Sequence, residues 1–203
     1  MFEKEFTACV LDTKLNLALQ TRSINNSNPK DAIFRTVHTT ICGSDIRICN
    51  HGDARILEDR VLGHEIVAIV ISPGIRSDIE SGDVVAIGAD VPCGACDFCK
   101  SKRSNLCEVH TAIGYQFDGG FAEYILYPEK YLSEAPIVKI KHDSDAYVYS
   151  LAEPAGCVIN GLEFSRVESN NNLAIIGAGP IGVMIAKLAM DQFSLIQSNI
   201  TFI

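Results

Sequence analysis

Short runs of hydrophobic residues, rich in Val, Ile and Thr, follow one another along the first 140 residues of the chain. Gly, Pro, Asp or Ser bounds most of these runs, a pattern typical of β-strands. The pattern predicts strands over 6–11, 32–40, 66–72, 84–87, 121–126 and 137–140. Only short helical turns are expected among them, over 44–49 and 97–100.

The pattern changes near residue 145. From 145 to 165 the apolar residues recur at roughly helical spacing, which predicts a helix. After a polar break at 170–172, the residues 173–177 have the pattern of a buried strand. A second helix is expected to begin at Pro180, because Pro suits the first turn of a helix, and a further strand is expected over 199–203.

Length and composition agree with a globular α/β chain of two parts. The 203 residues are 47% hydrophobic and 21% charged, which is typical of folded proteins. We therefore expect a β-rich domain over 1–150 and a β-α-β unit over 151–203.

Charge and hydropathy exclude several classes of protein. The chain carries 17 Lys and Arg against 25 Asp and Glu, and a net charge of −8 argues against nucleic acid as a partner. Apolar stretches are interrupted before they reach membrane-spanning length, so no membrane is expected either. The N-terminal residues MFEKEFTACV lack the basic and apolar regions of a secretory signal. We therefore expect a cytoplasmic protein.

Four of the eight cysteines lie close together in the sequence. They are Cys93, Cys96, Cys99 and Cys107. Four thiolates close a tetrahedral zinc shell without leaving a position for water, so this spacing predicts a structural zinc site. Free or disulfide-bonded cysteines are the alternative.

A glycine-rich loop follows the strand predicted at 173–177. Gly177, Gly179 and Gly182 fit the G-x-G-x-x-G pattern, and Pro180 and Ile181 lie within it. In this context the glycines permit a tight turn, a close approach of the pyrophosphate of NAD or NADP, and close packing of the helix. Packing of the helix on the strand without a ligand is the alternative. The choice between NAD and NADP stays open, because the acidic residue that hydrogen-bonds the ribose belongs at the end of the second strand and the chain is expected to stop inside that strand.

Further residues of metal-ligating type are scattered along the chain. Cys42 lies in ICGSD, His64 and Glu65 lie in LGHE, and Glu153 lies in LAEP. Taken singly, a buried Cys is usually a small apolar residue and a lone His is usually hydrogen-bonded without a metal. Spacing alone does not indicate that these residues meet.

Taken together, the motifs resemble the zinc-dependent medium-chain dehydrogenases, most closely the polyol (sorbitol-type) and threonine dehydrogenase branches. The similar segments are ICGSD, LGHE, SGDVV, the four-cysteine loop, DGGFAEY, AEPAGCVIN and IGAGPIG. The resemblance implies a GroES-like, β-barrel-type catalytic domain followed by the first β-α-β of a Rossmann domain. It also implies two zinc ions, one catalytic and one structural, with NAD or NADP as the cofactor.

The resemblance places a catalytic zinc on Cys42, His64 and Glu65, with Glu153 as a further ligand or close neighbour. His64 and Glu65 are adjacent, and side chains of adjacent residues in a strand point to opposite sides. Both reach one ion only if the backbone bends, so a role for Glu65 behind the ligands stays open.

The resemblance also gives roles to residues around that zinc. Asp45 corresponds to the carboxylate that fixes the tautomer of the liganding histidine, and Ser44 to the hydroxyl that passes the substrate proton outward. Many relatives have a histidine where this chain has Arg47, and an arginine cannot shuttle protons at ordinary pH. Arg47 is interpreted either as a ligand of an anionic group on cofactor or substrate or as a plain surface residue.

The implied reaction is the reversible oxidation of a small secondary alcohol, a polyol or sugar alcohol, by NAD(P). A threonine-type amino-alcohol dehydrogenase is one alternative. Because family members are considerably longer, an inactive zinc-binding fragment is another. The resemblance is compatible with a homo-oligomer for a full-length protein.

Overall fold

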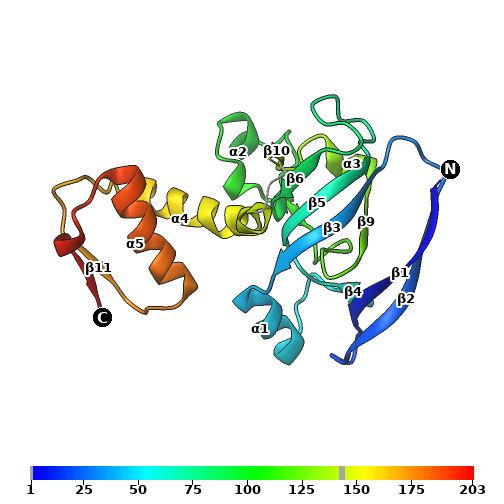
Figure 1. Cartoon of the computed structure of the whole chain (residues 1–203), viewed down its shortest axis with the longest axis horizontal. Helices are drawn as coiled ribbons and strands as arrows, with labels where there is room; N and C mark the ends of the chain where they lie inside the picture. Colours follow the sequence, from blue (N-terminus) through cyan, green and yellow to red (C-terminus); the bar gives the residue numbers. More distant parts are fainter. Residues whose placement is uncertain (1, 142–144) are drawn as a thin grey trace. The chain divides into compact units, whose positions relative to one another are not determined.

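The computed structural model describes residues 2–141 and 145–203. The chain divides into two compact units, Met1–Leu151 and Ala152–Ile203 (Figure 1). Each unit has its own buried apolar clusters. Among the described residues, no helix combines the length and the apolar character that crossing a membrane requires.

The first unit is β-rich, as the sequence predicts. Its strands are β1 (Phe2–Leu11), β2 (Leu17–Asn26), β3 (Ala32–Thr40), β4 (Arg60–Val61), β5 (Glu65–Ser72), β6 (Val84–Ile87), β7 (Asp90–Val91), β8 (Thr111–Ala112), β9 (Tyr124–Tyr127) and β10 (Ile137–Ile140). Its helices are α1 (Gly43–His51), α2 (Asp97–Lys100) and α3 (Glu129–Leu132), with 3-10 turns η1 (Ser104–Leu106) and η2 (Ala146–Leu151).

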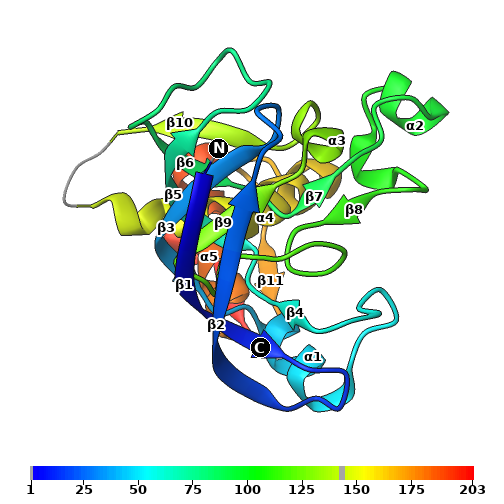
Figure 2. The same ribbon diagram turned by 90° about the vertical axis from the view of Figure 1, so that its right-hand side faces the viewer.

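A five-stranded antiparallel sheet with the order β10-β6-β5-β3-β9 forms the centre of this unit. Its middle strand β5 has the sequence EIVAIVIS and is largely buried, because it is flanked on both edges and covered by the core. Phe34 of β3 and Tyr127 of β9 pack edge to face in that core, with ring centroids 6.1 Å apart. Figure 2 shows the long β1–β2 hairpin of the second sheet, whose order is β2-β1-β4.

The pairing of β3 with β5 decides which residues meet. The register places Thr40, at the end of β3, opposite Glu65, at the start of β5. The residues that follow Thr40 therefore lie beside the residues that precede Glu65. This brings the segments ICGSD and LGHE together, although residues 46–61 separate them in the sequence.

Several sequence predictions need correction. The 10-residue strand β2 was not predicted, because its sequence LALQTRSINN carries polar residues on both faces and the strand forms by pairing with β1. The strand predicted at 121–126 lies instead at Tyr124–Tyr127. The turn predicted at 44–49 is a nine-residue helix, α1. The short strands β4, β7 and β8 and the helix α3 were also missed.

The second unit contains α4 (Ala152–Phe164), β11 (Leu173–Ile175), α5 (Pro180–Phe193), η3 (Gln197–Asn199) and β12 (Ile200–Phe202). Strands β11 and β12 are parallel and are joined through α5, so the predicted β-α-β unit is present. The helix predicted across 145–165 is divided, with the 3-10 turn η2 before α4. Val158, Leu162, Ala189 and Leu195 form the buried core of this unit.

Candidate functional site

Cys42, His64 and Glu65 converge at the junction of β3, α1 and β5. One ligand atom from each residue lies within 4.8 Å of the others. His64 and Glu65 are buried, at 5% exposure each. We call these residues the Cys–His–Glu cluster.

Backbone geometry at Gly63 lets adjacent side chains enter the same cluster. Gly63 has φ of +92°, a conformation that favours glycine, and a Cβ there would lie 2.7 Å from the Phe121 ring. Strand β5 begins only at Glu65, so the alternation of side chains along a strand does not apply to His64. Glu65 also accepts a hydrogen bond from the Thr40 hydroxyl group.

Two residues of helix α1 contact the imidazole ring of His64 from different sides. Asp45 Oδ1 lies 3.4 Å from Nδ1, and Ser44 Oγ lies 3.4 Å from Nε2. Asp45 is 3% exposed, and its Oδ2 accepts a hydrogen bond of 2.9 Å from the Cys42 backbone N–H. The Asp45 carboxylate therefore contacts both Cys42, the N-cap of α1, and the imidazole of His64.

Glu153 lies in the other compact unit, at the start of α4. The Cys157 thiol is 3.8 Å from its Oε1, one helical turn away. The structure describes Glu153 within its own unit, so its approach to the Cys–His–Glu cluster remains a prediction.

The other four predicted ligands also converge. Cys93, Cys96, Cys99 and Cys107 lie between β7 and β8, and their sulfur atoms are all within 4.8 Å of one another. The Sγ atoms of Cys96 and Cys99 are 3.5 Å apart. None of the eight cysteines, all of which are described, forms a disulfide. We call this group the four-cysteine cluster.

Backbone amides beside Cys93, one member of the four-cysteine cluster, favour its thiolate form. The N–H groups of Ala95 and Cys96 point at the Cys93 sulfur, at 3.5 and 3.3 Å, and lower the pKa of Cys93 to about 6. Gly94 supplies the turn that aims them, with φ of +69°. Thiolate is the form that binds metal ions.

The glycine-rich loop connects β11 to α5. Gly177 has φ of +94°, which only glycine adopts readily, and it makes the turn out of the strand. A Cβ atom at Gly182 would collide with the Gly177 carbonyl oxygen, so the helix packs closely on the loop. Nothing lies within 4 Å of the Cβ position of Gly179, the N-cap of α5, and Pro180 follows as its first residue.

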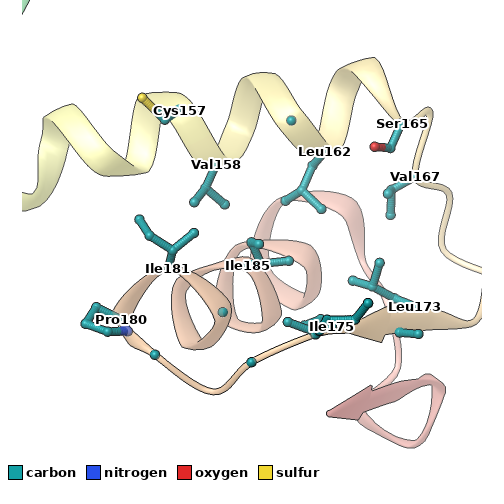
Figure 3. A pocket seen from close by; sticks show the side chains of 16 residues that line it. Cys157, Val158, Leu162, Ser165, Val167, Leu173, Ile175, Pro180, Ile181 and Ile185 are labelled. Atoms are coloured by element: carbon teal, nitrogen blue, oxygen red, sulfur yellow. The ribbon is translucent and has the colours of Figure 1, made fainter. Parts of the chain in front are cut away.

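A largely apolar hollow of about 730 Å³ lies beside this loop within the second unit (Figure 3). Val158 and Leu162 of α4 point toward Ile181 and Ile185 of α5, and the loop borders one side. Cofactor-binding roles for Gly177, Gly179, Pro180, Ile181 and Gly182 remain predictions.

The structure also reveals an ionic network that the sequence did not indicate. Asp53 accepts hydrogen bonds from the guanidinium groups of Arg47 and Arg55, and Arg55 lies over the ring of Tyr115. The Tyr115 ring is 5.8 Å from that of His64. No signal in the sequence joins these residues, because Tyr115 lies 60 positions beyond Arg55.

Comparisons with known proteins identify relatives of this chain among the dehydrogenases. A zinc-type alcohol dehydrogenase-like protein of Haemophilus influenzae, itself uncharacterized, is 33% identical over 196 residues, which are 96% of this chain and 56% of that protein. L-galactonate-5-dehydrogenase of Escherichia coli is 30% identical over 174 residues, 85% of this chain and 49% of the relative. The chain thus spans about half the length of the curated relatives it matches.

Solved structures of dehydrogenases superpose on most of this chain and on about half of their own length. A Sinorhizobium meliloti protein bound to NADP, described as a zinc-binding dehydrogenase, superposes with a TM-score of 0.80 at 31% identity, over 92% of this chain and 53% of that one. Galactitol-1-phosphate dehydrogenase from Escherichia coli gives a TM-score of 0.82 at 26% identity, over 97% and 55%.

A family comparison covers more than half of the chain. Residues 28–137, which include both clusters, match the family described as the alcohol dehydrogenase GroES-like domain. The predicted GroES-like fold is thereby confirmed. The chain belongs to the zinc-type alcohol dehydrogenases of the medium-chain dehydrogenase superfamily.

Proposed function

We propose that this chain carries the metal centre and the start of the cofactor domain of a zinc- and NAD(P)-dependent dehydrogenase that oxidises a small secondary alcohol. The observation that carries the proposal is the convergence of Cys42, His64 and Glu65 beside Ser44 and Asp45. Sulfur, imidazole nitrogen and carboxylate oxygen together are a donor set that suits zinc.

The buried contacts of His64 fit a metal ligand. With its proton on Nδ1, facing the Asp45 carboxylate, the imidazole keeps the lone pair of Nε2 for a metal ion. When bound, zinc would act as a Lewis acid and lower the pKa of the substrate hydroxyl group. Glu153 is proposed as a further ligand or close neighbour of the same ion.

Ser44 is the candidate for moving the substrate proton. Its hydroxyl group lies next to His64 and both donates and accepts hydrogen bonds, so it takes the proton of the alcohol as it gives up its own. The carbinol carbon loses its hydrogen as hydride while its C–O bond becomes C=O, and NAD(P) would supply the hydride acceptor. Asp45 holds the imidazole in place during this change.

The remaining predicted sites have structural and binding roles in this proposal. The four-cysteine cluster would hold a second zinc ion that ties down the segment between β7 and β8, since four thiolates leave no position for substrate. Gly177 and Gly179 would let the backbone approach the pyrophosphate at the N-terminus of α5, together with Pro180, Ile181 and Gly182.

The relatives favour a polyol-type substrate. They include L-galactonate-5-dehydrogenase, D-xylulose reductases and an erythritol/L-threitol dehydrogenase. A second candidate is an amino alcohol, because L-threonine 3-dehydrogenases are also about 30% identical. Both candidates use the same chemistry at the same residues.

Metal analysis of the purified chain tests the proposal. We expect two zinc ions per chain, one ion after Cys42→Ser and one ion after Cys99→Ser. Cys9→Ser, on β1 and outside both clusters, is the matched control and should retain both. Zinc content unaffected by Cys42→Ser would contradict the catalytic site. Zinc uptake without turnover of any polyol or amino alcohol by the chain alone would favour the inactive-fragment alternative.

A further inference from the structure

Two arginine side chains share one carboxylate beside helix α1. Arg47 donates from Nη2 to Asp53 Oδ2 at 2.9 Å. Arg55 donates from Nε to Asp53 Oδ1 at 2.8 Å and from Nη2 to Oδ2 at 3.0 Å. Two guanidinium groups against one carboxylate leave a net positive charge on this group, in a chain whose net charge is −8. We call Arg47 and Arg55 the arginine pair.

Two intermediate residues, Tyr115 and Ser44, lie between the arginine pair and His64 of the Cys–His–Glu cluster. Arg55 Cζ lies 3.8 Å from the centroid of the Tyr115 ring, which is 5.8 Å from the ring of His64. Arg47 follows Ser44 by three residues on α1, so their Cβ atoms are about 5–6 Å apart on one helix face. Ser44 Oγ is in turn 3.4 Å from His64 Nε2.

The arginine pair keeps donors available to a ligand. The side chains of Arg47 and Arg55 are 52% and 37% exposed, whereas that of Asp53 is only 10% exposed. Among the described contacts, Arg47 gives Asp53 a single hydrogen bond out of the five that a guanidinium can donate. The carboxylate therefore orients the pair while it accepts from one nitrogen of Arg47 and two of Arg55, and the remaining N–H groups are available to a ligand.

We propose that the arginine pair binds an anionic group, a carboxylate or a phosphate, on the alcohol whose hydroxyl group is activated at the Cys–His–Glu cluster. This inference rests on the proposed function and narrows its substrate to polyol acids or polyol phosphates. A planar guanidinium binds either group through two parallel charge-assisted hydrogen bonds. Asp53 is a positioning residue, because it holds both guanidinium groups before the ligand arrives and so reduces the entropy lost on binding.

Three ligands with the same six-carbon chain provide the test: neutral sorbitol, D-gluconate and sorbitol 6-phosphate. The Nε–H NMR signals of Arg47 and Arg55 report binding to the purified chain without any turnover. We expect saturable shifts with at least one of the anions, at a dissociation constant about tenfold or more below that for sorbitol. The anion that binds more tightly identifies the substrate group as carboxylate or phosphate.

Arginine variants test whether anion binding depends on Arg47 and Arg55 themselves. We expect Arg47→Gln and Arg55→Gln each to weaken anion binding about tenfold. Arg103→Gln should leave it unchanged; this control removes an exposed arginine that also lies over an aromatic ring, 5.1 Å from the centroid of Phe98. Sorbitol binding as tightly as both anions, or Arg103→Gln weakening binding equally, would overturn the inference.

Metal content separates this inference from the proposed function. Zinc lost with Cys42→Ser but no anion binding at Arg47 and Arg55 would contradict only the substrate assignment. Anion binding without a zinc ion that depends on Cys42 would contradict the proposed function and the substrate assignment that rests on it.

Discussion

Asp45 Oδ1 lies 3.4 Å from Nδ1 of His64, and both side chains are almost fully buried. A carboxylate placed there favours a proton on Nδ1 and leaves Nε2 as the metal-binding atom. Asp45 comes from the first turn of α1 and His64 from the residue before β5. The helix and the strand thus determine the chemistry of one imidazole ring together.

We expect Asp45→Asn to weaken zinc binding at the Cys–His–Glu cluster about tenfold to a hundredfold, because an amide stabilises the ligand tautomer less well. Competition between the protein and a zinc chelator measures this change. Asp191→Asn, which alters a surface ion pair in the other unit, is the matched control. Equal zinc affinity in the two variants would argue against the role of Asp45.

Gly182→Ala and Gly179→Ala are expected to differ in their effect on the stability of the second unit. The new methyl group at 182 would collide with the Gly177 carbonyl oxygen, and we expect a loss of about 1–3 kcal/mol in the stability of the second unit. At 179 there is open space and φ is −74°, so stability should change by less than about 1 kcal/mol. Denaturant unfolding followed by circular dichroism measures both effects.

We expect Gly179→Ala, the variant with the smaller loss of stability, to have a direct effect on cofactor binding. If Gly179 lies against the pyrophosphate, the methyl group introduced by Gly179→Ala should weaken NADH binding even though the fold is intact. A fluorescence titration with NADH measures this affinity. Unchanged NADH affinity in a variant of normal stability would show that position 179 does not face the cofactor.

Removal of the metal from the four-cysteine cluster should loosen the first unit. We expect excess chelator to lower its melting temperature, because a structural zinc ion stabilises the folded state by binding it alone. Cys107→Ser, at the buried cysteine of the cluster, should lower it without chelator, whereas Cys157→Ser should not. A melting curve that chelator leaves unmoved would indicate that the cluster holds no metal.

The Asp53 carboxylate should make stability depend on pH in the acid range. The Arg55 guanidinium that donates to it holds the pKa of Asp53 well below its usual range. Because the folded-state pKa is the lower one, the stabilisation is present above about pH 4 and is lost as pH falls further.

Asp53→Asn should therefore remove part of the acid sensitivity of wild-type stability, at a cost of about 1 kcal/mol at neutral pH. Urea unfolding at a series of pH values between 2 and 7 checks this. If the variant and the wild type lost stability in parallel below pH 4, the pairing with Arg55 would contribute nothing in solution.

The sequence predicted those parts of the fold whose burial follows from local pattern. The strand at 32–40 and the strand at 84–87 were predicted at their observed bounds, because both are runs rich in β-branched residues. Strand β2 was missed because it is half polar and is stabilised by its long pairing with β1. The start of α5 was predictable from Pro180, whose fixed φ suits a first turn.

The candidate sites also differ in whether local sequence patterns predict them. The four-cysteine cluster could be predicted from spacing, because its ligands lie within a single loop and need no distant strand to meet. Cys42, His64 and Glu65 are far apart in the chain, and only the resemblance to a family suggested that they belong together. The resemblance drew attention to Arg47, but its association with Asp53, Arg55 and Tyr115 was outside both kinds of reasoning.

By itself the sequence determined the residue types, the four-cysteine cluster, the glycine-rich loop and most of the secondary structure, since each depends on contacts within a few positions. The tertiary structure decided that Thr40 pairs with Glu65, which places Cys42 beside His64. It also decided that Arg47 and Arg55 both donate hydrogen bonds to Asp53. The physical reason is strand register: a local pattern fixes which residues form a strand, whereas the packing of the whole sheet fixes which partner each residue faces.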